Sequence, residues 1–143
     1  ISDAEQQHMD AVKKLIDKYG LVDPVVDDGT GVFVNKELEV LYEELVYTGN
    51  EFGDAGLVSL QSALLAGALI EEIDIDDLEL AIHDTLPDDV TQTYENLLKG
   101  SRNHLRAFVR QLDNMGIVYE ARVLDSVAFA DIVNSSMERG RSR

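Results

Sequence analysis

Apolar residues recur every three or four positions through the two longest proline-free segments, and this helical spacing constrains the fold most strongly. Strand-like alternation is almost absent, with at most a short extended pair within residues 22–34. The sequence therefore predicts an all-α fold, organised as a helix bundle. The two stripes run through Leu60, Leu64, Ala68, Glu71, Ile75, Leu78 and Ile82, and through Tyr94, Leu97, Leu98, Ser101, His104, Leu105, Phe108, Leu112 and Met115.

Capping and turn residues predict where the helices begin and end. The first helix is expected over residues 1–19, with Ser2 as its cap and Gly20 as its stop. A second helix begins after Asn35, ends at residues 49–50 and buries a stripe that includes Leu38 and Leu45. The two long helices follow over residues 59–83 and 90–115, and Asp125 caps a short last one.

Length and composition fit a single domain. The chain has 143 residues, 45% of them hydrophobic, which is enough for a core. We expect one helical domain over residues 1–138 and a disordered basic tail over residues 139–143. The absence of cysteine excludes disulfides, thiolate metal sites and thiol catalysis. No apolar run approaches the roughly 20 residues that a membrane-spanning helix needs.

The charge of the chain selects against some partners. Its 28 acidic and 12 basic residues give a net charge of −16. Such a surface repels phosphate backbones and anionic lipids, so we expect neither nucleic acid nor membranes as partners. It attracts cations, although solubility or adaptation to high salt would explain the acidity equally well. We expect a soluble protein, and the sequence leaves its compartment open. Because the chain begins at Ile1 rather than methionine, it is either cytoplasmic or exported after loss of an N-terminal segment.

Glu5 and His8 lie one helical turn apart, on the face that continues through apolar residues such as Val12 and Leu15. An anionic oxygen and a neutral imidazole directed into a core need a partner, and a metal ion is one. The Glu-x-x-His pair has this role in di-iron helix bundles. Alternatively, Glu5 completes a capping box with Ser2 while His8 is solvated.

Polar residues also interrupt the apolar stripe of the third helix. Of the adjacent pair Glu71 and Glu72, we expect Glu71 to be the buried one, because Glu72 continues into an acidic, wet side of the helix. Asp74, one turn beyond Glu71, could offer a second ligand oxygen. It could equally belong to the solvated acidic end of the helix.

In the fourth helix, His104 is the second imidazole that faces inward. It could ligate a metal, or it could be a core histidine bonded to a backbone carbonyl or to Ser101. Three arginines repeat every four residues beside it, at positions 102, 106 and 110, and predict an ion-pairing face rather than an anion site. Asn103 has no evident partner.

Four segments resemble the uncharacterised ferritin-like domain proteins of bacteria and archaea, which are related to rubrerythrin and other di-iron carboxylate proteins. They cover nearly the whole chain, and the run from Gly100 to Arg106 is the most specific part. The segments are Glu5–Lys13, Gly67–Leu78, Tyr94–Phe108 and Val123–Ile132.

The resemblance implies a ferritin-like antiparallel helix bundle. By position, Glu5 and His8 match the first Glu-x-x-His pair, Glu71 a lone carboxylate, and His104 the imidazole of the second pair. Ser101 stands where the second pair has its glutamate. Family members also carry an acidic helix before the first pair, so we expect the first bundle helix to be absent from this chain. Self-association into a homodimer or larger homo-oligomer would cover the exposed stripes.

The leading hypothesis is a ferritin-like metal-binding protein with Glu5, His8, Glu71, His104 and Asp74 as candidate ligands. Iron, mononuclear or di-iron, is expected first, and zinc or manganese could use the same ligands. Activity, if any, would be of an oxidase or peroxidase type, and no catalytic residue is assigned. The alternative is a non-catalytic acidic bundle that serves as a structural or partner-binding module without metal.

Overall fold

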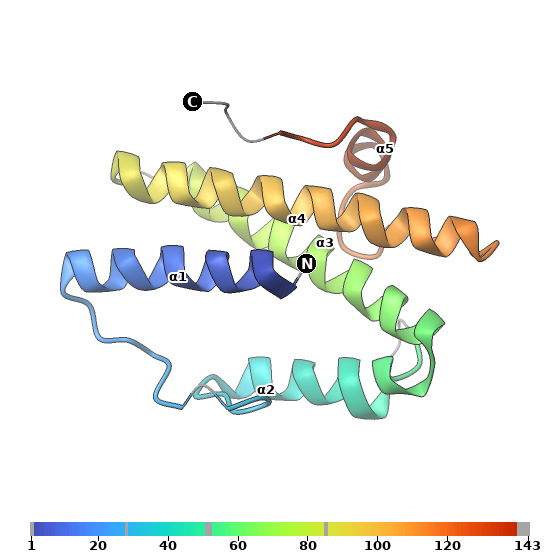
Figure 1. Cartoon of the computed structure of the whole chain (residues 1–143), viewed down its shortest axis with the longest axis horizontal. Coiled ribbons are helices and arrows are strands. Elements are labelled where there is room, and N and C mark those ends of the chain that lie inside the picture. Colours follow the sequence, from blue (N-terminus) through green and yellow to red (C-terminus); the bar gives the residue numbers. More distant parts are fainter. Residues whose placement is uncertain (1, 28, 51–52, 85, 140–143) are drawn as a thin grey trace. The chain divides into compact units, whose positions relative to one another are not determined.

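The computed structural model describes residues 2–27, 29–50, 53–84 and 86–139, and these residues form five α-helices and no strand (Figure 1). The all-α prediction is therefore confirmed. Across the described ranges, every helix is too short or too polar to span a bilayer. The elements are α1 (Ser2–Tyr19), α2 (Lys36–Glu43), the π-helical turn η1 (Glu44–Thr48), the 3-10 turn η2 (Gly56–Val58), α3 (Leu60–His83), α4 (Asp88–Asn114) and α5 (Ser126–Asn134).

The chain divides into two compact units, Ile1–Ala66 and Gly67–Arg143. The expectation of one domain over residues 1–138 stays a prediction. Of the tail expected to be disordered, Arg139 is exposed and residues 140–143 lie outside the described residues. The predicted cap at Ser2 depends on a side chain that is outside the described structure as well.

In the first unit, α1 ends as predicted at Gly20. This glycine has a φ of 63°, and the amide of Leu21 donates to the carbonyl of Ile16 at 3.0 Å. A six-to-one bond of this kind around a left-handed residue closes a helix and favours glycine, which pays no Cβ penalty there.

The cap of α2 is also confirmed, because the Asn35 side chain accepts from the amides of Glu37 and Leu38. The buried stripe of this helix is predicted only in part. Leu45 is buried, but Leu38 is 49% exposed. Seven residues separate the two on one face of a continuous α-helix, and the wider π-helical turn that follows α2 breaks this alignment.

In the second unit, α3 and α4 run antiparallel. Gly67 of α3 faces Phe108 of α4, and four residues further along α3 Glu71 faces His104, four residues back along α4. The helices approach closely at Gly67, where an added Cβ atom would lie 2.7 Å from the Phe108 ring. Ile75, Leu105 and Leu112 are fully buried and form the core of this unit.

Arg102 and Arg106 of α4 confirm the predicted ion-pairing face, and both bind Glu138 beyond α5. Arg102 donates to the two carboxylate oxygens at 2.7 and 2.6 Å, and Arg106 donates to one of them at 3.0 Å. Arg106 is 8% exposed and also donates to the Ile132 carbonyl at 2.8 Å, so it helps to hold α5 on α4 (Figure 1). Arg110 is exposed.

Asn103 has a partner that the sequence did not reveal. Its side-chain nitrogen donates to the Glu138 carbonyl at 2.9 Å, and its oxygen accepts from the Glu138 amide at 2.8 Å. The sequence did not indicate this partner because it lies 35 positions away, and helical periodicity carries no information on such a contact. Arg102, Asn103, Arg106 and Glu138 are called the C-terminal clamp below.

Gly67→Ala tests the close approach of α3 and α4. Alanine favours a helix by about 1 kcal/mol over glycine, whereas overpacking typically costs about 1–3 kcal/mol. We expect the clash with Phe108 to dominate, with a net loss of about 1 kcal/mol in chemical denaturation. Gly53→Ala is the control, because a Cβ atom there meets nothing within 4 Å. A Gly67→Ala protein as stable as the parent would contradict this packing.

The ion pairs of Glu138 predict how the stability of the fold changes as the pH falls. Hydrogen bonds from Arg102 and then from Arg106 lower the pKa of its carboxyl group from 4.5 to about 2, against the opposing effect of burial. A lowered pKa means that the clamp stabilises the fold above about pH 4.5 and that this contribution is lost as the pH falls toward 2. We expect Glu138→Gln to lose less stability than the parent between pH 5 and 2 in denaturation curves. Parallel curves for the two proteins would contradict it.

Candidate metal centre

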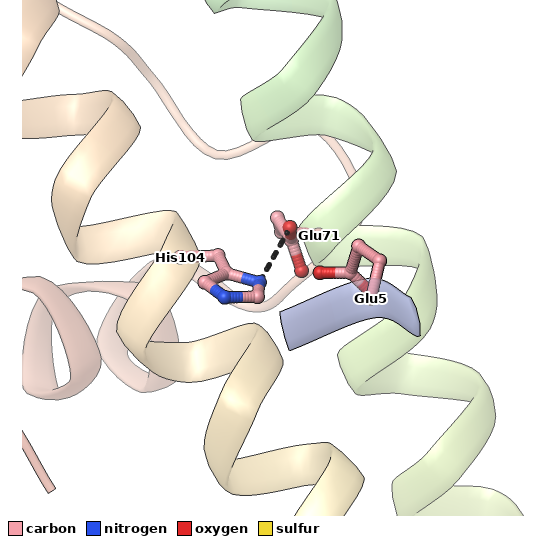
Figure 2. A group of neighbouring side chains, drawn as sticks. All are labelled: Glu5, Glu71 and His104. Carbon is pink, nitrogen blue, oxygen red and sulfur yellow. Dashed lines mark hydrogen bonds and ion pairs between the residues drawn. The ribbon is translucent and has the colours of Figure 1, made fainter. Parts of the chain in front are cut away.

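Glu71 of α3 and His104 of α4 form a buried pair. His104 Nδ1 lies 3.2 Å from Glu71 Oε1, and the side chains are 12% and 7% exposed respectively (Figure 2). The antiparallel register of the two helices brings them together, because each lies on the apolar face that packs against the other helix. The predicted burial of Glu71 is confirmed. A carboxylate and an imidazole held in this way form half of a typical Fe or Zn ligand set.

Glu5 and His8 form a second pair, in the first unit. His8 Nδ1 lies 3.1 Å from Glu5 Oε2, as their spacing of one turn on α1 predicts. Their side chains are 45% and 25% exposed, so this pair is wetter than that of Glu71 and His104. A carboxylate and an imidazole in contact can bind one ion together, or the imidazole can orient the carboxylate.

Within the second unit, Glu71 on α3 and His104 on α4 could hold a metal ion between them (Figure 2). The candidate ligands Glu5 and His8 belong to the first unit, and their role at a metal stays a prediction. Asp74 is exposed on α3, in agreement with the solvated end of the helix, and its role as a ligand stays a prediction.

Glu72 contradicts the expected wet position, because it is 0% exposed and thus more buried than Glu71. The connection between α4 and α5 folds back over α3 and supplies donors to this carboxylate. Oε1 accepts from the Tyr119 hydroxyl at 2.6 Å, and Oε2 accepts from the amides of Val123 and Leu124 at 3.0 and 2.9 Å. The amide of Arg122 lies 3.1 Å from both oxygens.

Four donors therefore satisfy the Glu72 carboxylate, which has about four acceptor positions. Burial, and then the hydrogen bond to Glu72, raise the pKa of Tyr119, so the phenol keeps the proton that it donates. Glu72 is therefore a structural carboxylate. The donors to Glu72 lie 47 to 52 positions away, so no local pattern in the sequence indicated this structural role.

Ser101 lies where the expected pattern would have a second glutamate. It is 5% exposed on α4, one turn before His104, so it shares the buried face as predicted. A hydroxyl at this position is a weaker metal ligand than a carboxylate and carries no charge. The second unit thus supplies one carboxylate and one imidazole from this face.

The comparison with known sequences identifies the family. The chain belongs to the family described as "Uncharacterized protein domain (DUF2202)", which it matches over residues 1–136. It is also similar to the uncharacterized protein MJ0754 of Methanocaldococcus jannaschii, with 47% identity over all 143 residues and 74% of the length of that protein.

Among solved structures, the chain resembles a crystal structure of the hypothetical protein MJ0754 from Methanococcus jannaschii. The TM-score is 0.86 at 46% sequence identity, over 96% of this chain and 75% of the other. The two proteins therefore share their helical fold.

Tyr119→Phe tests the structural role of Glu72. The substitution removes one hydrogen bond to a buried charge, so we expect a loss of about 1.5–3 kcal/mol in the free energy of unfolding. Glu72→Gln should cost more, because its amide group points hydrogen atoms at backbone amides that also donate. Glu79→Gln, at an exposed position of the same helix, is the control. Equal stability of the Glu72 and Glu79 variants would contradict the role.

Proposed function

We propose that this chain is a ferritin-like metal-binding protein in which Glu71 and His104 hold an iron ion. The observation that carries the proposal is the buried pair of Glu71 and His104, 3.2 Å apart on antiparallel helices. The resemblance of four sequence segments to ferritin-like proteins supports the choice of fold.

The burial of the pair is the physical argument for a cation. Removing a carboxylate from water costs several kcal/mol unless a positive charge and hydrogen bonds offset it. His104 supplies a full charge only when it is protonated, whereas a divalent ion supplies it while the imidazole is neutral. The adjacent Glu72 has its own four donors and does not compete for the same ion.

Glu5 would add a second carboxylate, with His8 beside it as a further ligand or as the residue that orients it. Asp74, which is exposed on α3, is a further candidate ligand. Carboxylate and imidazole suit iron, and zinc or manganese are the competing ions. Bound iron would supply the redox chemistry, in which Fe(II) is oxidised by dioxygen or peroxide. The protein residues would bind and orient the ion within a largely buried surrounding.

A second candidate function keeps the helical fold without metal. Ser101 in place of a carboxylate favours it, and so does the contact between Glu71 and His104, since each offers the other a hydrogen-bond partner. On this view the acidic helices form a structural or partner-binding module. Self-association into a homo-oligomer remains an expectation under both functions.

Metal loading distinguishes the two. After anaerobic addition of Fe(II), we expect a stoichiometric complex and a higher melting temperature, since a ligand at 100 times its Kd stabilises by about 2.7 kcal/mol. His104→Ala should abolish most of this gain. His83→Ala is the matched control, because it removes an exposed imidazole at the end of α3. Zn(II) and Mn(II), added separately, would identify the preferred ion.

Two results would contradict the metal function. One is a parent protein that binds no metal and melts at the same temperature with and without Fe(II). The other is an equal loss of binding in the His83 and His104 variants, which would place the ion elsewhere. The first result would favour the module without metal.

A further inference from the structure

The C-terminal clamp contacts every polar group of one glutamate residue. Asn103 binds both the amide and the carbonyl of Glu138, as a neighbouring β-strand would. Arg102 binds both carboxylate oxygens through two parallel hydrogen bonds, at 2.7 and 2.6 Å. Such two-pronged contacts recognise a carboxylate by its shape as well as its charge.

Within the clamp, Arg106 is held by several contacts besides that with Glu138. Arg106 is 8% exposed and is fixed by the Ile132 carbonyl, by the Ser135 hydroxyl at 2.8 Å and by Asn103 Oδ1 at 2.8 Å. It still donates to the Glu138 carboxylate at 3.0 Å. The lowered pKa of Glu138, about 2, agrees with a site that strongly favours the ionised carboxylate. A preorganised site loses little conformational entropy when it binds.

From these contacts we infer that Arg102, Asn103 and Arg106 form a recognition site for a glutamate residue in an extended peptide. The chain's own Glu138 fills the site, and an acidic segment of a partner protein binds there in its place. None of the three residues is a candidate metal ligand, so the inference does not depend on the proposed function. The net charge of −16 disfavours the approach of an acidic partner, so binding depends on the local contacts with Arg102 and Arg106.

A cavity beside the clamp extends the site to the residue before the glutamate. It has a volume of about 350 Å³, and its lining includes Val109, Arg110, Val133 and Met137. Met137 precedes Glu138 and is 48% exposed, so its side chain lies at the cavity without filling it. Polar residues, Asp113 and Asn134 among them, also line this cavity, so the probe peptide keeps the chain's own methionine before the glutamate.

The chain's own segment competes with any external peptide. A tethered ligand has an effective concentration in the millimolar range, so a free peptide binds the parent protein weakly. Replacing Glu138 removes the competing carboxylate and leaves α4 unchanged. The test therefore uses the full chain with Glu138→Ala, and Glu138→Gln as a milder second variant that keeps the side-chain shape.

The probe is acetyl-Met-Glu-amide, titrated into the folded Glu138→Ala protein and followed by the NMR signals of the Asn103 side-chain amide. We expect saturable shifts, with binding at least tenfold weaker in the parent. Loss of the charge-assisted pair should weaken binding about tenfold or more, so acetyl-Met-Gln-amide and the double variant Arg102→Ala/Glu138→Ala should both bind poorly. Lys99→Ala in the Glu138→Ala protein is the charge control.

Three results would overturn the inference. The first is the absence of saturable shifts in both folded Glu138 variants. The second is equal binding of the glutamate and glutamine peptides. The third is an identical response to inorganic phosphate at the same ionic strength, which would mean that the two arginines bind any anion.

Discussion

The second unit depends most on the hydrogen bonds that the buried carboxylate of Glu72 accepts. A fully buried charge is tolerated only when its hydrogen-bonding capacity is met, and Tyr119 and the amides of residues 122–124 meet it. These bonds attach the connection before α5 to the middle of α3. The side chain of Glu71, one residue earlier, is thereby held toward α4 rather than toward this connection.

Helix α4 then carries two different chemical environments on two faces. One face meets α3, with the close contact at Gly67 and the pair of Glu71 and His104 one turn further along. The other face holds the C-terminal clamp, in which Asn103, the residue before His104, binds Glu138. Adjacent residues of one helix thus serve the candidate metal centre and the candidate peptide site. Both sites use side chains whose conformations are fixed by packing and hydrogen bonds.

The features predicted correctly from sequence are those that depend on nearby residues. Asn35 and Asp125 cap helices, Gly20 ends one, and Glu71 is buried because it continues an apolar stripe. The wet position predicted for Glu72 was wrong because its hydrogen-bond donors lie dozens of residues away, and the partner of Asn103 was not evident for the same reason. The predicted burial of Leu38 was wrong for a local reason, because the sequence does not indicate the π-helical turn that follows α2. The ligand set and the ferritin-like relationship rest on the resemblance and stay proposals.

The central claim is that Glu71 and His104 bind iron, and anomalous X-ray scattering tests it most directly. Crystals of the full chain, loaded anaerobically with Fe(II), would be measured above and below the iron absorption edge. We predict an anomalous peak within about 2.0–2.2 Å of a Glu71 oxygen and a His104 nitrogen, a bonding distance like that of other first-row metal ligands. An anomalous peak bonded to other residues, or no peak beside this pair in fully loaded protein, would contradict the account.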